Sequence, residues 1–362
     1  MDIMENKHFD LGKVIDQAIN DALSKRGVVN ILIAGRTGVG KSTLVNAIFQ
    51  GNLATTGQGK PVTQNTREIS KEGIPVNLFD TRGLELEHFK ATMNELEDLV
   101  KTKRNDVNPQ NHIHAAWICI SENSRRVEDA EIALCELLAQ YMPVVIVLTK
   151  CSSDNGFRNI VQSLLPKAKN VVRVNSIPET LDDGHVLKPF GLVELVDLTM
   201  EVVPEGQQAA FAASQKVSVQ QKKTKSHKVV AGAATAAMTV GASPIPFSDA
   251  FLLVPIQVGM LAGITSVFGL DLKKSFLTTL VSSTITGAGA TIIGRSIVTN
   301  LMKLVPGIGT IAGSVISAGT ASAITVAFGE AYIATLAQLF SVKDAVDITG
   351  EDIIKEFKIR YK

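Results

Sequence analysis

Residues Gly35–Thr43 read GRTGVGKST; they follow an apolar run, VVNILIA, and precede a helical pattern, LVNAIF. Glycines let such a loop turn tightly, so that successive N–H groups point inward at a phosphate, and the N-terminus of the next helix adds partial positive charge. The lysine supplies a point charge for the β- and γ-phosphates, and the serine supplies a hydroxyl for Mg²⁺. The pattern predicts a nucleotide-binding loop whose contacting residues are Gly35, Thr37, Gly38, Val39, Gly40, Lys41, Ser42 and Thr43.

The composition of the whole chain excludes some classes of protein. A net charge of +1 over 362 residues identifies no partner, and we expect no nucleic acid among the partners. The three cysteines lack C-x-x-C spacing and a histidine cluster, so neither a disulfide framework nor a zinc site is expected. The opening residues, MDIMENKHFD, carry no secretory signal pattern, and we expect a reducing, cytoplasmic location.

The pattern of apolar residues divides the chain into three parts. In residues 1–205, short apolar runs alternate with helical patterns, which predicts an α/β domain with a mostly parallel sheet, helices on both faces and a first helix at its N-terminus. Residues 206–228 are polar and basic and predict a linker or surface helix. Residues 229–362 are rich in Ala, Gly, Ser and Thr and predict an all-α, hydrophobic helical domain.

A nucleotide switch also needs a threonine that can reach Mg²⁺ and an aspartate followed three residues later by glycine. DTRG, Asp80–Gly83, ends an apolar run and supplies both the aspartate, which orders metal-bound water, and the glycine, whose N–H can contact the γ-phosphate. The segment PVTQNTRE offers two threonines, Thr63 and Thr66. Either one can equally be an ordinary loop or strand residue.

With GRTGVGKS, the Thr66–Arg67 pair and DTRG, the chain resembles the regulatory GTPases that include Era-like proteins, septins and immunity-related GTPases. The resemblance favours Thr66 and implies GTP or GDP and Mg²⁺ as cofactors. It implies a metal site of Ser42, Thr66 and Asp80, and catalytic roles for Lys41, Thr66, Arg82 and Gly83. Residues Gly232–Leu270 resemble a C-terminal hydrophobic domain of unknown function that is fused to such GTPases in bacteria.

The predicted base-binding segment departs from the guanine-specific pattern Asn/Thr-Lys-x-Asp. Here it reads TKCS, so Thr149 and Lys150 match and Ser152 stands where the aspartate belongs. A serine accepts one hydrogen bond without charge assistance, which loses about 1.5 to 3 kcal/mol. Asp154 could reach the base if the loop is reshaped, and VNSIPE offers Ser176 for a backbone contact. GTP is therefore expected from the resemblance, and ATP stays open.

A second departure concerns hydrolysis. Many switch GTPases place glutamine directly after the DxxG glycine to orient the attacking water, and this chain has Leu84 there. We expect slow intrinsic hydrolysis unless an arginine helps, with Arg82, Arg125 and Arg126 as candidates. A nucleotide-dependent homodimer would supply such an arginine from the partner chain. The alternative for each arginine is a solvated surface side chain.

The hydrophobic C-terminal part raises the question of a membrane. Ala250–Leu270 is long and apolar enough to cross a bilayer, Leu304–Gly329 is a marginal span, and Gly259/Gly263 and Gly309/Gly313 permit close helix contact. The lysines Lys222–Lys228 favour an anionic cytosolic leaflet, so we expect residues 229–340 to contact lipid, with peripheral or integral attachment. A soluble bundle, a ribosome- or RNA-associated GTPase, and a nucleotide-gated pore-forming or membrane-remodelling effector remain as alternatives.

Overall fold

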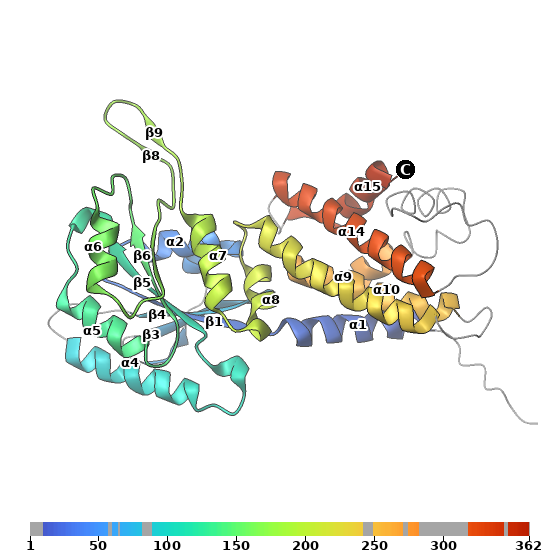
Figure 1. Ribbon diagram of the computed structural model, residues 1–362, viewed down its shortest axis with the longest axis horizontal. Helices are drawn as coiled ribbons and strands as arrows, with labels where there is room; N and C mark the ends of the chain where they lie inside the picture. Colours follow the sequence, from blue (N-terminus) through green and yellow to red (C-terminus); the bar gives the residue numbers. More distant parts are fainter. Residues whose placement is uncertain are drawn as a thin grey trace, which may run out of the picture. The chain divides into compact units, whose positions relative to one another are not determined.

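The computed structural model describes residues 10–56, 60–63, 66–81, 89–241, 249–270, 274–281, 318–343 and 347–361. They form two compact units (Figure 1). We call Arg26–Ser218 the nucleotide unit, and Met1–Lys25 together with Val219–Lys362 the helical unit.

The nucleotide unit is built on a seven-stranded sheet in the order β2-β3-β4-β1-β5-β6-β7. Strand β1 pairs in parallel with β4 on one side and with β5 on the other. Strands β6 and β7 continue the parallel pairing beyond β5, while β2 and β3 add antiparallel pairs at the opposite edge, next to β4. The mostly parallel α/β fold predicted from the alternating runs is therefore confirmed. The strands are β1 (Val29–Ala34), β2 (Lys60–Pro61), β3 (Thr66–Lys71), β4 (Ile74–Thr81), β5 (Ala115–Ser121), β6 (Val144–Thr149) and β7 (Asn170–Arg173).

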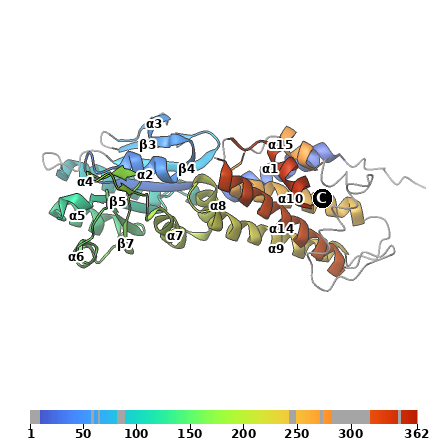
Figure 2. The ribbon, with the colours of Figure 1, turned by 90° about the horizontal axis from the view of Figure 1, so that it is seen from above.

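Helices cover both faces of this sheet (Figure 2), and its central strands are therefore buried on both sides. On one face Leu32 packs in a core with Leu96 and Leu134. On the other face Phe49 stacks on Trp117 at 5.8 Å, and the Trp117 indole N–H donates to Thr199 Oγ1 at 3.0 Å. The helices are α2 (Lys41–Ile48), α3 (Leu53–Thr56), α4 (Phe89–Arg104), α5 (Asp129–Leu138), α6 (Phe157–Leu164), α7 (Leu192–Val202) and α8 (Glu205–Ser214).

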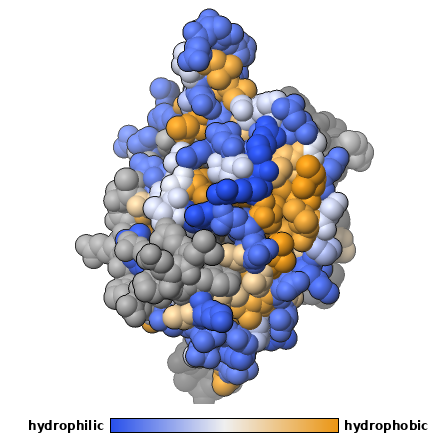
Figure 3. Space-filling view, turned by 90° about the vertical axis from the view of Figure 1, so that its left-hand side faces the viewer, coloured by the Kyte–Doolittle hydropathy of each residue, from blue (hydrophilic) through white to orange (hydrophobic). Residues whose placement is uncertain are grey.

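A small hairpin interrupts the connection between β7 and α7. Its strands are β8 (Glu179–Thr180) and β9 (Val186–Leu187), and backbone hydrogen bonds between Asn175 and Phe190 close its base. In Figure 1 the hairpin projects from the nucleotide unit, and Figure 3 shows apolar residues gathered below its hydrophilic tip.

Helix α8 belongs to the nucleotide unit, whereas we expected a linker or surface helix over residues 206–228. Its Phe211 is fully buried and meets Phe49 edge-on at 6.2 Å. Gln50 Nε2 donates to Ala213 O at 2.9 Å, and the Lys216 N–H donates to Ile48 O at 2.9 Å. The glutamines at the start of α8 and the lysines after it make the segment look polar. Its second half, AAFAAS, is nevertheless apolar enough to pack on the sheet.

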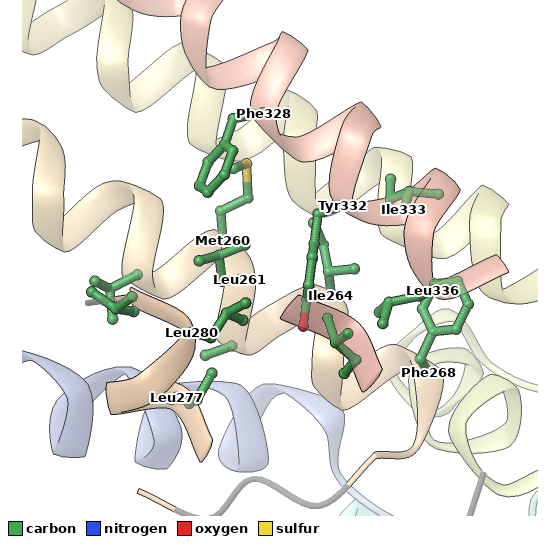
Figure 4. Packing of buried hydrophobic residues seen from close by; sticks show 14 of the residues in the cluster. Met260, Leu261, Ile264, Phe268, Leu277, Leu280, Phe328, Tyr332, Ile333 and Leu336 are labelled. Carbon is green, nitrogen blue, oxygen red and sulfur yellow. The ribbon is translucent and has the colours of Figure 1, made fainter. Parts of the chain in front are cut away.

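The helical unit is built around three long helices that pack on one another, α9 (Val219–Gly241), α10 (Asp249–Phe268) and α14 (Ala318–Val342). Figure 4 shows Met260, Ile264 and Phe268 of α10 facing Phe328, Tyr332 and Leu336 of α14. Small residues permit this packing, since a Cβ at Gly263 would stand 2.8 Å from Val229 Cγ1, and one at Gly329 would stand 2.6 Å from Val230 Cγ2. The remaining described helices of the unit are α1 (Leu11–Arg26), α11 (Lys274–Val281) and α15 (Gly350–Tyr361).

Helix α1 packs in the helical unit, and this differs from the expectation that it completes the α/β domain. Ile15, Ala18 and Ala22 are buried in the same core as α10 and α14. Asp16 also pairs with Lys274 of α11 at 2.6 Å. The helical spacing of apolar residues in α1 predicted a helix with one buried face, but it carried no information about which core that face joins.

Lys222 is an exception to the expectation that the lysines of residues 222–228 lie on the surface. Its side chain is fully buried, Nζ donates to the carbonyl of Phe268 at 3.0 Å, and the ammonium lies 5.2 Å from the centre of the Phe340 ring. Burial lowers the pKa of Lys222 well below its ordinary value. This lysine therefore joins α9 to the end of α10 instead of facing solvent or lipid.

One helix among the described residues, Ala321–Val342, is long and apolar enough to cross a membrane, and 56% of its most apolar stretch is buried inside the protein. The span expected at Ala250–Leu270 falls on α10 (Asp249–Phe268), in which Leu253–Phe268 is a shorter apolar stretch. Most of the second expected segment, including Gly309 and Gly313, lies outside the described residues.

Candidate nucleotide site

The predicted phosphate loop connects the end of β1 to α2, which begins at Lys41. Gly35, Gly38 and Gly40 have φ angles of 144°, 79° and 102°, which side chains with a Cβ rarely adopt. A Cβ at Gly35 would also collide with the carbonyl oxygen of Cys119 on β5. The sheet therefore approaches the loop so closely that only glycine fits where the loop leaves β1.

The ammonium group of Lys41 lies across this loop. Its Nζ donates to Gly35 O at 2.5 Å and to Arg36 O at 3.1 Å. The Leu44 N–H donates to Gly40 O at 2.9 Å and closes the first turn of α2. A positive charge, a glycine-lined turn and a helix N-terminus thus meet at one point, which is the donor set that a phosphate chain requires.

The predicted metal ligands come from the same edge of the sheet. The pairing of β1 with β4 sets Ile33 beside Asp80, so Asp80, one residue before the end of β4, lies next to the start of the phosphate loop. Ser42 is exposed in the first turn of α2. A hydroxyl and a carboxylate near a triphosphate are the ligands that Mg²⁺ takes in phosphate-loop proteins, so this donor set fits the ion.

Thr66 is the first residue of β3 and lies opposite Thr81, one residue from Asp80. It is buried, and its N–H donates to Thr63 Oγ1 at 3.0 Å. Its role as a metal ligand stays a prediction. The other residues predicted for this segment, Arg82 and Gly83, lie outside the described residues.

The predicted base-binding segment begins where β6 ends. Thr149 Oγ1 donates to the carbonyl of Val39 at 2.5 Å, which links the segment to the phosphate loop. Lys150 has a left-handed backbone with a φ of 53°. Its side chain lies beside Gly40, since a Cβ built on that glycine would stand 3.9 Å from Lys150 Cε. Ser152 is exposed and Ser176 is half-buried. The chain thus brings Thr149 and Lys150 to the loop, and leaves the contacts of the two serines with a base as predictions.

Asp154 is the nearest candidate replacement for the missing aspartate. Its Oδ1 accepts the Arg158 N–H at 2.9 Å, at the start of α6, and lies 3.5 Å from Arg173 Nε. These contacts hold the carboxylate within the loop. Ser152 consequently remains the side chain at the position where the guanine-specific pattern has its aspartate.

The arginines considered for catalysis have partners within the chain. Arg125 donates to the carbonyls of Ser153 and Asp154, the latter at 2.5 Å. Arg126 pairs with Glu128 at 3.2 Å, and Arg36 of the phosphate loop pairs with the same carboxylate. In the described part of the chain, these side chains stabilise loops around the site.

Two charged residues near the base segment were missed by sequence reasoning, namely Glu122 after β5 and Arg173 at the end of β7. They form an ion pair at 2.5 Å in which Glu122 is fully buried and Arg173 is half-buried. The available signal was their position, because each stands at the carboxyl end of an apolar strand, and the carboxyl ends of parallel strands meet at the edge where α/β proteins bind ligands.

Family models match two parts of the chain. Residues 30–150 match the family described as 50S ribosome-binding GTPase, and residues 205–357 match a domain of unknown function, DUF697. The second match begins at α8, which the structure places in the nucleotide unit.

Curated relatives match shorter stretches. The chain is 27% identical over 180 residues to the translocase of chloroplast 108 of Physcomitrium patens, which covers 45% of this chain and 17% of that protein. It is 40% identical over 80 residues to the tRNA modification GTPase MnmE of Cupriavidus pinatubonensis, which covers 21% of this chain and 16% of that protein. The chain therefore spans less than a fifth of the length of these relatives.

Two solved structures are also similar to the chain. A probable GTP-binding protein engB is 16% identical with a TM-score of 0.33, and the G domain of the T. maritima FeoB iron transporter is 21% identical with a TM-score of 0.32. Each match covers 48% of this chain and 98% of the other. Taken with the phosphate loop and the predicted metal ligands, the family matches show that the chain carries a P-loop GTPase domain, of a class that binds GTP and GDP with Mg²⁺, followed by a C-terminal DUF697 domain.

Proposed function

We propose that this GTPase is a switch whose nucleotide state controls contact between the helical unit and membrane lipid. One observation carries the proposal: both chain connections between the units adjoin β1 or α2, the two elements that flank the phosphate loop. Helix α1 ends at Arg26, and β1 begins at Val29 and leads directly into the phosphate loop. On the other side, Lys216 is bonded to Ile48, the last residue of α2, and α9 begins three residues later.

This arrangement supports a switch because α2 and β1 hold the loop that carries the phosphates. A change at the γ-phosphate that moves either element also pulls on a segment continuous with α1 or α9. Both helices contribute to the core of the helical unit, through Ile15 of α1 and Val230 of α9. A small shift at the nucleotide is thus communicated to a packed core, which responds by repacking in discrete steps.

Lipid is proposed as the partner of the helical unit because its helices are long, apolar and rich in small residues. Ala321–Val342 has the length and composition of a span, although more than half of it is buried in the unit's own core. Contact with lipid therefore requires that the helices open or that their exposed edges lie on the membrane. Lys228 is exposed, as a lysine that meets an anionic surface must be, whereas Lys222 is buried. The chain would then act at the cytosolic face of a membrane.

We further propose that basal GTP hydrolysis is slow and that a second copy of the chain accelerates it. Leu84 cannot orient water, and Arg125 and Arg126 are engaged within the chain. Turnover per chain should rise with protein concentration if a dimer supplies the missing group. Turnover that stays flat over a wide concentration range, without an activator, contradicts the dimer.

A soluble, RNA-associated GTPase is the second candidate, supported by the similarity to a tRNA modification GTPase over 80 residues and by the buried core that the described helices of the helical unit share. Salt-sensitive co-sedimentation with ribosomes would favour it, because phosphate contacts weaken steeply as salt rises.

Flotation with lipid vesicles tests the leading proposal. The full chain is mixed with vesicles of phosphatidylcholine and phosphatidylglycerol, and separate samples contain a non-hydrolysable GTP analogue, GDP or no nucleotide. We expect the floated fraction to differ between the two nucleotides. The Lys41→Ala variant, which lacks the phosphate contact, should behave alike in all three samples. A wild-type chain that stays at the bottom of every gradient, soluble and monodisperse, contradicts lipid contact.

A further inference from the structure

The buried pair Glu122–Arg173 has a geometry that an incidental ion pair would not need. The Glu122 side chain is fully buried, in a turn that follows β5. Its Oε2 accepts Arg173 Nε at 2.5 Å, and its Oε1 accepts Arg173 Nη2 at 3.0 Å. Two parallel hydrogen bonds fix the mutual orientation of the groups as well as their distance.

The same carboxylate holds the base segment. Glu122 Oε1 also accepts the N–H of Ser152 at 2.9 Å. Ser152 stands where guanine-specific GTPases have their aspartate, so the carboxylate fixes the backbone of the residue predicted to contact the base. The bond joins residues that are 30 positions apart in the chain.

Arg173 holds the second segment predicted to contact the base. It is the last residue of β7, three residues before Ser176, and its guanidinium lies 5.7 Å from the centre of the Phe190 ring. The Phe190 N–H in turn donates to the carbonyl of Asn175 at 3.0 Å. Arg173 Nε also lies 3.5 Å from Asp154 Oδ1. The Arg173 guanidinium therefore contacts three segments: Glu122 after β5, Asp154 in the loop after β6, and Phe190 where the β8–β9 hairpin closes.

The charges of this pair are maintained despite burial. Burial raises the pKa of the Glu122 carboxyl, but hydrogen bonds from Arg173 and the Ser152 N–H outweigh it and hold that pKa below its ordinary value. Hydrogen bonding to Glu122 likewise raises the pKa of Arg173. Neutralising the carboxylate would leave the partly buried guanidinium with the more distant Asp154 as its counter-charge and would weaken the bond to Ser152.

We propose that Glu122 and Arg173 are positioning residues for recognition of the purine base. They hold the Ser152 backbone and the approach to Ser176 where both segments can meet the base. Because Asp154 is engaged elsewhere, recognition depends on a neutral hydroxyl and backbone groups, whose hydrogen bonds require accurate placement. The inference rests on the predicted roles of Ser152 and Ser176 in base contact.

A pair that only stabilises the fold would behave differently. Its loss would lower the melting temperature and reduce the affinity for every nucleotide in the same proportion. Loss of a positioning pair changes the ratio of guanine to adenine affinity, because phosphate contacts depend on Lys41 and the glycine loop, which the pair does not touch. The ratio is therefore the decisive measurement, and the melting temperature serves as the record of stability.

The test uses the full chain with Glu122→Gln, which keeps the shape of the side chain and removes its charge. Affinities for fluorescent GDP and ADP derivatives are measured by titration with Mg²⁺. We expect GDP affinity to fall about tenfold and ADP affinity less than about twofold, as for loss of one charge-assisted hydrogen bond. The matched control is Glu194→Gln, whose carboxylate pairs with Arg158 at 3.3 Å on the surface of the same unit and whose loss should leave both affinities unchanged.

Arg173→Lys gives a second, milder variant, since lysine keeps the charge and loses the two-pronged bond. It should lower the GDP to ADP ratio in the same direction, and it decides the question if Glu122→Gln does not fold. Equal losses for both nucleotides, or no change in the ratio in a folded variant, overturn the inference and leave nucleotide binding intact. A wild-type chain that shows no preference for guanine overturns the predicted base contacts together with this inference.

Discussion

The hydroxyl of Thr149 donates a hydrogen bond to the carbonyl of Val39 at 2.5 Å, and this bond joins the base segment to the phosphate loop. Val39 and Thr149 are both buried and lie 110 positions apart in the chain. Because the two segments would bind opposite ends of a nucleotide, the bond sets the distance between the two subsites.

We therefore expect Thr149→Val, which preserves the shape of the side chain and removes the donor, to weaken GDP binding. An unsatisfied buried carbonyl costs about 1 to 3 kcal/mol, which corresponds to roughly 5- to 150-fold in affinity if the loop relaxes in the free protein. Titration with a fluorescent GDP derivative measures the change. The control is Thr180→Val, the same substitution at an exposed position of the hairpin. Wild-type affinity in Thr149→Val would show that the bond does not set the geometry of the site.

Lys41→Ala should abolish binding of GTP while the protein stays folded. The substitution removes the phosphate charge and the hydrogen bonds to Gly35 O and Arg36 O, whereas the glycine turn is fixed by β5 packing against it. Isothermal titration together with circular dichroism checks both parts of the prediction. Binding within a few-fold of the wild type contradicts the assigned phosphate contact.

Ser42→Ala and Asp80→Ala should differ from Lys41→Ala in kind. Each removes one predicted Mg²⁺ ligand and leaves the phosphate contacts in place, so nucleotide should still bind but with little dependence on added Mg²⁺. Titrations of GDP at several Mg²⁺ concentrations measure this dependence. A full Mg²⁺ response in both variants would remove Ser42 and Asp80 from the metal site.

The nucleotide unit was predictable from sequence to a large extent because its signals are local. The glycines of the phosphate loop and the apolar runs of the strands act within ten residues of where they stand. The helical unit was less predictable, since an apolar helix face such as that of α1 does not specify its partner. The contacts of Lys222 and Glu122 were not predictable because their partners, Phe268 and Arg173, lie 46 and 51 positions away.

His114 predicts how stability depends on pH. It is buried, its Nδ1 accepts the Asn30 N–H at 2.9 Å, and its Nε2 lies 3.0 Å from Pro109 O. Only the neutral ring can accept at Nδ1, and burial lowers the pKa of His114 below its ordinary value, near 6.5. The unfolded chain therefore binds a proton at higher pH than the folded chain does.

The contribution of His114 to stability is consequently complete above about pH 6.5 and is lost as pH falls from there toward the folded-state pKa. Denaturant unfolding at pH 7.5 and pH 5.5 measures it, and His114→Gln should reduce the difference between the two pH values. His185→Gln, an exposed histidine in the hairpin turn, serves as the control. An unchanged pH dependence in His114→Gln would assign the effect to other groups.

The packing of α1 gives the last prediction, that Ile15→Asp destabilises the helical unit and spares nucleotide binding. Ile15 is fully buried in the core formed with α10 and α14. Placing a carboxylate there loses apolar burial and leaves a charge without a partner, which costs about 3 kcal/mol or more. Lys13→Asp is the control, since that side chain is 86% exposed on the same helix.

Limited proteolysis distinguishes the two units in this experiment. In Ile15→Asp, cleavage within residues 219–362 should accelerate many-fold relative to Lys13→Asp, while GDP affinity stays near that of the wild type, because the sheet core around Leu32 contains no residue of α1. If both variants resist proteolysis equally, α1 is not part of the helical core. If Ile15→Asp instead loses GDP binding with its helical unit intact, α1 supports the phosphate loop directly, as its position immediately before β1 would also permit.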